Sequence, residues 1–76
     1  MRGSLSARET EVLTLVARGM RNREIATTLG VSQETVQTHM KRLFIKLEVN
    51  GRTAAATLAV ARGLVPPPVF SSGVVE

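Results

Sequence analysis

The sequence predicts an all-α fold of four helices, and three observations support this prediction. Residues 22–42, NREIATTLGVSQETVQTHMKR, place Ala26, Gly30 and Val36 at the spacing of two helices that cross at a tight turn. Apolar residues recur every three or four positions in the flanking segments, which is the period of an amphipathic helix. Serines typical of helix starts precede the first and third helical segments.

The geometry of a helix-turn-helix corner explains the residue type found at each of these positions. Two helices that cross steeply leave no room at Ala26 for a side chain longer than a methyl group. The turn needs a residue at positive φ, which Gly30 adopts without strain. The corner encloses four apolar side chains: Ile25, Leu29, Val31 and Val36. Its second helix is held away from the body of the domain, in the way that suits the major groove of DNA.

The first two helices have recognisable starts. Ser6 and Glu9 form an S-x-x-E capping box, and the first helix stops near Gly19. Its apolar stripe consists of Val12, Leu13, Leu15, Val16 and Met20. The second helix is expected over about residues 23–29, with Asn22 as its cap.

The third helix is expected over about residues 33–47, capped by Ser32. At about 100° per residue, one arc is apolar and forms the core face: Val36, Met40, Leu43 and Leu47. The opposite arc is polar and exposed: Glu34, Gln37, Thr38, Lys41 and Arg42. Ile45 also falls on the exposed arc, where the pattern does not explain an apolar residue.

The fourth helix, about residues 52–62, is small and apolar on nearly every side and stops at Gly63. One arc would close the core: Ala55, Leu58 and Ala59. The other would face water or a second subunit: Thr53, Ala54, Thr57 and Ala61. The domain is therefore expected over residues 5–64, between an MRGS leader of artificial appearance (1–4) and a proline-rich tail (65–76) with little regular structure.

Composition narrows the functional classes. The chain has 76 residues, 43% of them hydrophobic, which is enough for one small core. Its net charge of +4 and pI of 11.2 suit a polyanionic partner. Without cysteine it has no disulfide or thiolate zinc site, which fits a cytoplasmic location. No apolar run is long enough to span a membrane or to form a signal peptide.

These pieces, in their order and spacing, resemble the DNA-binding domain of the LuxR family, also called the GerE-type helix-turn-helix. The matching segments are LSARETEVLTLVARGM, NREIATTLGVSQETV, KLEV and the Gly63-Leu64 ending, together with His39 and Arg52. The resemblance implies the output domain of a bacterial transcription regulator, present here either as a fragment or as a stand-alone member. Three departures are Gln37, where the family often has Lys or Arg, Glu48, where it usually has Gly, and Arg21, where Ser or Thr is common.

The resemblance implies that the domain binds duplex DNA through the third helix. The short side chains on the second arc of the fourth helix predict a homodimer there, weak in solution because they bury little area. The resemblance places base contacts at Gln37 and Lys41, and Thr38 is a further candidate beside them. The candidates for phosphate contact are Asn22, Arg23, Ser32, Thr35, Arg42, Lys46 and Arg52. For two of these a structural role is the alternative: Ser32 as a plain helix cap, and Arg52 as the partner of an acid.

Other chemistry finds little support in the residues. His39 has no second histidine or cysteine to complete a metal site, so we expect a hydrogen-bonded residue at the edge of the core. No catalytic group, cofactor or small-molecule ligand is predicted. The alternative function is a protein-interaction module, similar to sigma-factor region four, that docks another regulator or RNA polymerase. Ile45 and the apolar fourth helix favour it, whereas the polar and cationic arc of the third helix favours DNA.

Overall fold

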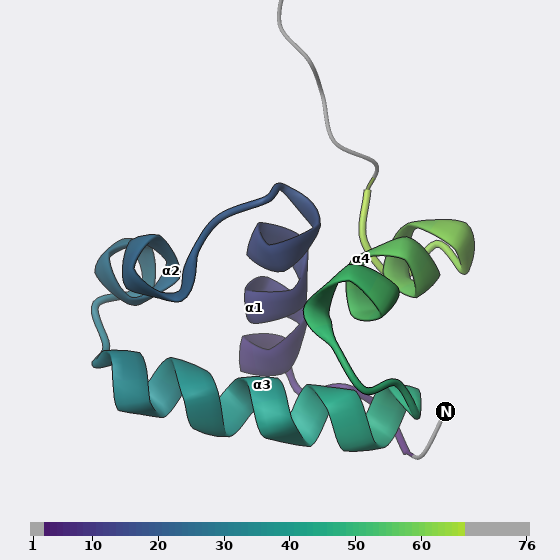
Figure 1. The fold of residues 1–76 in the computed structure, drawn as a ribbon, viewed down its shortest axis with the longest axis horizontal. Coiled ribbons are helices and arrows are strands. Elements are labelled where there is room, and N and C mark those ends of the chain that lie inside the picture. Colours follow the sequence, from purple (N-terminus) through teal and green to yellow (C-terminus); the bar gives the residue numbers. More distant parts are fainter. Residues whose placement is uncertain (1–2, 67–76) are drawn as a thin grey trace, which may run out of the picture.

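The computed structural model describes residues 3–66, which form four helices and no strand (Figure 1). The helices are α1 (Ala7–Ala17), α2 (Asn22–Leu29), α3 (Gln33–Leu47) and α4 (Arg52–Ala61). The prediction of an all-α, four-helix fold is therefore confirmed. Residues 1–2 of the expected leader and residues 67–76 of the expected tail lie outside the described part of the chain.

Helix α1 is the central support of the domain. In Figure 1, α3 runs along one edge, α1 stands over its middle, and α2 and α4 lie on either side of α1. Helix α1 packs against each of the other three helices, and α3 also packs against α2 and α4. In Figure 1 the other three helices all lie on one side of α3, and its opposite side faces away from them.

The core lies where the four helices meet. Its buried apolar side chains are Val12, Leu13, Leu15, Val16, Ile25, Ala26, Val36, Met40, Leu43, Leu47, Ala55, Ala59 and Val65. The predicted core face of α3 is therefore confirmed. Leu58, expected in the core, is only half-buried, because it lies on the flank of α4. Val65, the first residue of the expected tail, has 4% of its surface exposed and packs into the core.

The starts of α1, α2 and α3 are set by side chains that accept backbone N–H groups. The Ser6–Glu9 capping box is confirmed, with the Ser6 N–H donating to Glu9 Oε1 at 2.9 Å and the Glu9 N–H to Ser6 Oγ at 3.1 Å. The prediction of Asn22 as a cap is wrong, because Arg21 caps α2 and Asn22 is its first residue. Glu24 reaches back to accept the Arg21 N–H at 2.8 Å, which starts the helix one residue earlier.

Two residues in the left-handed conformation mark the ends of the paired helices. Gly30 has φ +70° at the end of α2, as the turn was expected to require. Glu48 has φ 59° and ψ 44° at the end of α3. Glycine is the residue most often found there, since a Cβ atom is crowded in this conformation. Glu48, which stands where the family usually has Gly, therefore adopts the same left-handed turn, and its Cβ atom strains the backbone there.

Glu48→Gly should be about 1 kcal/mol more stable than Glu48→Ala, because only glycine removes the Cβ crowding at positive φ. Both substitutions delete the carboxylate, so their difference isolates the backbone conformation. Urea denaturation of the two variants gives the free energies of unfolding. An alanine variant as stable as the glycine variant would show that this turn stores no strain.

Candidate nucleic-acid interface

The outer face of α3 is the side turned away from the core. It consists of Glu34, Gln37, Thr38, Lys41, Arg42 and Ile45, all of them exposed. Ile45 has 63% of its surface exposed, the only large hydrophobic side chain so exposed among residues 3–66. The structure thus brings the three predicted base-contacting residues, Gln37, Thr38 and Lys41, together on one open surface.

The predicted base-contacting residues differ in the hydrogen-bonding groups that they keep available. The Thr38 hydroxyl donates to the Glu34 carbonyl oxygen at 3.1 Å, so its proton is used within the helix while its methyl group and lone pairs are not. Gln37 carries an amide that can both donate and accept, and Lys41 carries a charged donor. These are the groups that the edges of base pairs recognise in a groove.

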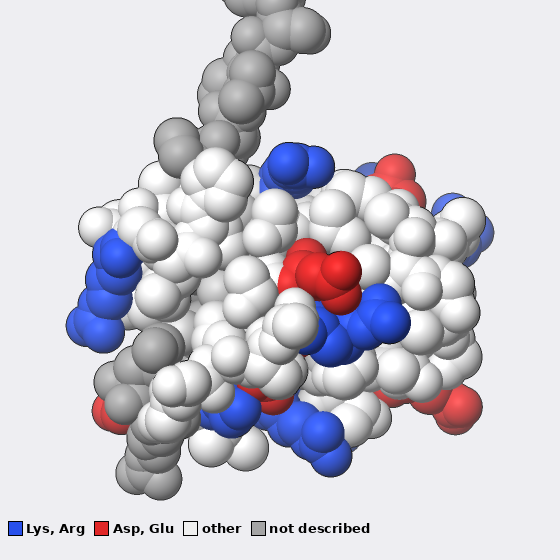
Figure 2. Space-filling view, turned by 180° about the vertical axis from the view of Figure 1, so that it is seen from behind, with Lys and Arg blue, Asp and Glu red and all other residues white. Residues whose placement is uncertain are grey.

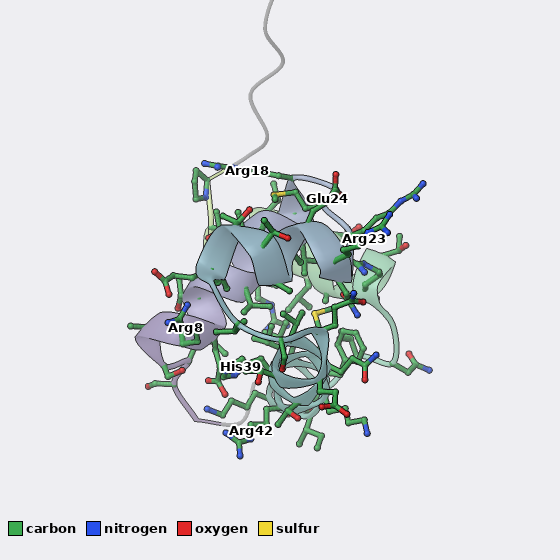
Figure 3. The ribbon with its side chains drawn as sticks, turned by 90° about the vertical axis from the view of Figure 1, so that its left-hand side faces the viewer. Arg8, Arg18, Arg23, Glu24, His39 and Arg42 are labelled. Atoms are coloured by element: carbon green, nitrogen blue, oxygen red, sulfur yellow. The ribbon has the colours of Figure 1, made fainter. Side chains whose placement is uncertain are left out.

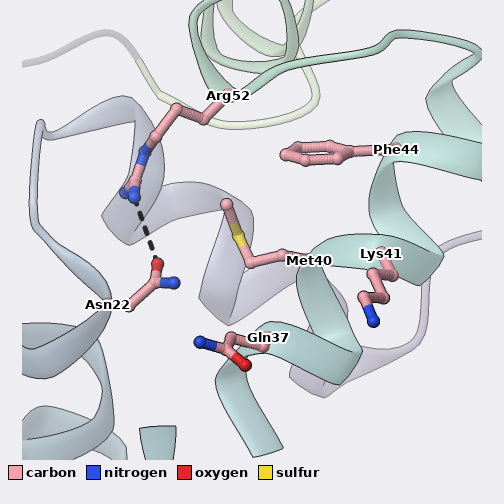
Figure 4. Close-up of a pocket in the computed structure, with 6 residues that line it drawn as sticks. All are labelled: Asn22, Gln37, Met40, Lys41, Phe44 and Arg52. Atoms are coloured by element: carbon pink, nitrogen blue, oxygen red, sulfur yellow. Dashed lines mark hydrogen bonds between the residues drawn. The ribbon is translucent and has the colours of Figure 1, made fainter. Parts of the chain in front are cut away.

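A shallow depression of about 310 Å³ opens beside this outer face (Figure 4). Its lining consists of Asn22, Gln37, Met40, Lys41, Phe44 and Arg52. It therefore brings two of the predicted base contacts next to two of the predicted phosphate contacts. Sequence reasoning did not single out Phe44, although Phe44 follows Met40 by one helical turn and shares its side of α3.

Arg23 and Arg42 are the predicted phosphate contacts whose side chains project freely into solvent. Arg23 extends from α2 and Arg42 from α3, and they point in different directions on the two sides of the α3 axis (Figure 3). Both residues are exposed. A helix lying in a groove has a phosphate strand on each side, so cations on both sides suit that placement.

Ser32 and Thr35 are engaged at the start of α3. Ser32 Oγ accepts the Thr35 N–H at 3.1 Å and lies 3.0 Å from Thr35 Oγ1. The predicted Ser32 cap is therefore confirmed. Ser32 is exposed and Thr35 is half-buried, so the cap leaves the serine hydroxyl at the surface.

Lys46 lies at a different place from the other candidate cations. Its Nζ donates to Glu9 Oε1 at 2.7 Å and to the Ser4 carbonyl oxygen at 3.1 Å. Glu9 is buried, with 3% of its surface exposed. The Lys46 hydrogen bond, followed by that from the Ser6 backbone, holds the pKa of Glu9 below its ordinary value. The charge of Lys46 thus serves an ion pair that ties α3 to α1, which weakens its candidacy for phosphate contact.

Arg52 also has partners within the domain. Its Nη1 donates to Asn22 Oδ1 at 3.1 Å, and its Nη2 donates to the Met20 carbonyl oxygen. From the sequence, the expected alternative partner of Arg52 is an acidic residue. The partners of Arg52 in the structure are instead a side-chain amide and a backbone carbonyl. Asn22 and Arg52, predicted separately as phosphate contacts, are therefore parts of one hydrogen-bonded unit.

The outer face of α4 consists of Thr53, Ala54, Thr57 and Ala61, all exposed as the sequence predicts. Thr53 and Thr57 also line a depression of about 320 Å³ between α4 and the end of α1. The short side chains leave the backbone of α4 accessible to close approach by a second helix.

His39 is half-buried at the edge of the core, as expected, but the expected hydrogen bond is absent at one of its nitrogens. Nδ1 is closed off from solvent, and no group within residues 3–66 lies in reach to bond it. Within the same residues, no three His, Cys, Asp or Glu side chains gather as metal ligands would. None of the four helices is both long and apolar enough to cross a membrane.

Charges of both signs lie next to each other on the face opposite that of Figure 1 (Figure 2). Arg8 and Glu11, one turn apart on α1, form an ion pair of 3.6 Å. A surface of mixed charge attracts a polyanion less than a uniformly positive surface does. The outer face of α3, where Lys41 and Arg42 accompany a single carboxylate, is the better candidate for a nucleic-acid interface.

Comparisons with known proteins match the chain to one family of regulatory proteins. The profile of the family described as "Bacterial regulatory proteins, luxR family" (GerE) matches residues 3–59. The chain is 50% identical over 60 residues to the uncharacterized transcriptional regulatory protein YhcZ of Bacillus subtilis (strain 168). This match covers 79% of the chain but only 28% of YhcZ, so the chain spans under a third of that relative's length.

Solved structures show the same fold. The transcription factor GerE superposes with a TM-score of 0.75 at 31% identity, covering 84% of this chain and 96% of GerE. The Vibrio cholera VqmA–ligand–DNA complex superposes with a TM-score of 0.76 at 33% identity, covering 84% of this chain and 28% of VqmA. The arrangement of the four helices is therefore shared with proteins of one regulatory family.

Proposed function

Because the chain is a helix-turn-helix domain of the luxR family of bacterial transcription regulators, we propose that it binds duplex DNA sequence-specifically by placing α3 in the major groove. One observation carries the proposal: the polar outer face of α3 is open to solvent while the opposite face is buried. A helix with its side chains is about 10–12 Å across, and the major groove is about 12 Å wide. VqmA, one part of which shares this fold, is seen in a complex with DNA.

Base recognition is assigned to Gln37, Thr38 and Lys41. A glutamine amide can bond adenine N6 and N7 together, and a lysine can donate to guanine O6 and N7. The Thr38 methyl group can contact a thymine methyl group while its hydroxyl stays bonded to the helix. Each good contact of this kind is worth about 1–3 kcal/mol of discrimination between bases.

Phosphate contacts are assigned first to Arg23 and Arg42, the exposed cations on the two sides of α3. The hydroxyl of Ser32 and the first turn of α3 supply neutral donors. Lys46 and Arg52 make their hydrogen bonds inside the domain, so we assign them a supporting role. Phosphate contacts position a protein without reading sequence.

The homodimer is assigned to the outer face of α4. Its side chains are short, so two such helices can approach closely, but they bury little apolar area. The contact between two subunits is therefore weak in solution. DNA supplies the remaining free energy of association by holding two subunits on half-sites about one helical turn apart.

Salt dependence tests this function. With Arg23 and Arg42 each neutralising about one phosphate per subunit, affinity for duplex DNA should fall about tenfold between about 50 and 200 mM salt. Arg23→Ala and Arg42→Ala should each reduce the slope of log affinity against log salt by about 0.9. Fluorescence anisotropy with a random-sequence duplex measures both quantities.

The rival function, docking another regulator or RNA polymerase, rests on the exposure of Ile45. A docking surface centred on an apolar residue would bind its partner with little response to salt. DNA affinity that is negligible, or equal at low and high salt, would favour this rival. Loss of DNA affinity in Ile45→Ser, with an unchanged salt slope, would instead place Ile45 in the groove beside Lys41.

A further inference from the structure

Arg52 joins three parts of the chain that are distant in sequence. It is the first residue of α4, and its guanidinium bonds Asn22 Oδ1, 30 residues away, and the Met20 carbonyl oxygen, 32 residues away. Asn22 begins α2, and Met20 lies in the connection between α1 and α2. One side chain thus spans from α4, on one side of α1, to α2 on the other (Figures 1 and 4).

This bond fixes the orientation of the Asn22 amide. A guanidinium has only donors, so the atom of Asn22 that faces Arg52 must be the carbonyl oxygen. The amide is planar, so its NH2 group is then turned away from Arg52. Figure 4 shows the Asn22 nitrogen pointing into the depression, on the side where Gln37 lies. Two N–H donors are therefore presented beside the face of α3 assigned to DNA.

Building on the proposed function, we propose that Arg52 is a positioning residue that does not touch DNA: it holds the Asn22 amide so that Nδ2 donates to a DNA phosphate. An N–H group forms a favourable hydrogen bond with a phosphate oxygen. The strength of this hydrogen bond depends on how directly the N–H points at the oxygen. An asparagine free to rotate would spend part of its time with the oxygen outward, where it would repel the phosphate. The Arg52–Asn22 bond removes that alternative.

The substitution Asn22→Asp removes the NH2 donor of residue 22 without destabilising the fold. An aspartate keeps an oxygen for Arg52, and a negative charge at the start of α2 favours the helix, so the melting temperature should not fall. The NH2 group is lost, and affinity for duplex DNA should fall about tenfold or more on all sequences alike. Thr28→Asp is the matched control: it adds the same charge to α2 at an exposed position that does not line the depression.

A double-mutant cycle shows whether Arg52 acts through Asn22. Arg52→Lys keeps the charge but cannot bond two acceptors in a fork, so it should weaken DNA binding about tenfold. In an Asn22→Ala background the same substitution should have no further effect, since no amide remains to be oriented. Circular dichroism melts of each variant identify any loss that comes from unfolding.

Salt dependence distinguishes positioning from direct contact. Arg52→Met should leave the slope of log affinity against log salt unchanged, whereas Arg42→Met should reduce it by about 0.9. Asn22→Asp binding no more weakly than Thr28→Asp, or Arg52→Lys weakening both backgrounds equally, would overturn this inference while the proposed function stands. A parent chain that binds no duplex would overturn the proposed function, and the inference with it.

Discussion

Lys46→Met should lower the free energy of unfolding by about 2–3 kcal/mol near neutral pH. Methionine keeps the length of the side chain but removes the ammonium group that bonds Glu9 Oε1. The Glu9 carboxylate would then stay buried with Ser6 as its remaining hydrogen-bonding partner. A domain of this size has about 4–11 kcal/mol of total stability, so the loss is a large fraction.

The pH dependence of that loss identifies its cause. The pKa of Glu9 is below its ordinary value of 4.5 in the folded parent, chiefly through the Lys46 hydrogen bond. Its contribution to stability is therefore complete above pH 4.5 and disappears as the pH falls through the folded pKa. Urea denaturation should show a large difference between parent and Lys46→Met at neutral pH and a small one in acid. A difference that does not depend on pH would mean that lost packing, not lost charge pairing, destabilises the variant.

A second variant completes the test. Glu9→Gln removes the charge that Lys46 pairs with, and glutamine keeps an oxygen that can accept the Ser6 N–H. Combined with Lys46→Met, it should recover part of the lost stability, because no buried charge then lacks a partner. A double variant less stable than Lys46→Met alone would contradict this explanation.

Ala54→Glu should abolish cooperative binding to a palindromic site while sparing weak binding to a half-site. Ala54 lies on the exposed face of α4, away from the outer face of α3. A two-fold dimer brings the same patch of both subunits together, so one substitution sets two like charges face to face. Since the proposed contact would bury only short side chains, it would have little free energy with which to offset that repulsion.

Electrophoretic mobility shift with palindromic and half-site duplexes measures this effect. The parent should occupy both halves of the palindrome together, whereas Ala54→Glu should occupy them independently. The half-site affinity serves as the internal control, because it depends on α3 and not on the dimer. Unchanged cooperativity in Ala54→Glu would exclude this face of α4, and Ile45 would be the next position to test.

Local signals were readable from the sequence. The Ser6–Glu9 capping box, the Ser32 cap and the left-handed Gly30 each depend on residues within three positions of one another, so sequence spacing was enough to predict them. The burial of one face of α3 followed from helical periodicity. The start of α2 was misplaced because Arg21 is not a residue type that commonly caps helices.

The non-local pairs were not predictable. Lys46 meets Glu9 across 37 positions, and Arg52 meets Asn22 across 30. These pairs depend on how α3 lies against α1 and how α4 lies relative to α2, which no spacing in the sequence reveals. A lysine and an arginine expected to contact phosphate were consequently found bonded within the domain. The exposed positions of Gln37, Thr38 and Lys41 were predicted, because exposure follows from the same periodicity that places the core.

Selection of bound sequences from a random duplex library, for the parent, Gln37→Ala, Lys41→Ala and Arg42→Ala, tests most directly the claim that the outer face of α3 reads DNA. Gln37→Ala and Lys41→Ala should each lose preference at one or two base pairs, at a cost of about 1–3 kcal/mol per lost contact. Arg42→Ala should bind every sequence more weakly and keep the parent's preferences. A Gln37→Ala variant that selects the same sequences with the same affinity as the parent would contradict the assignment.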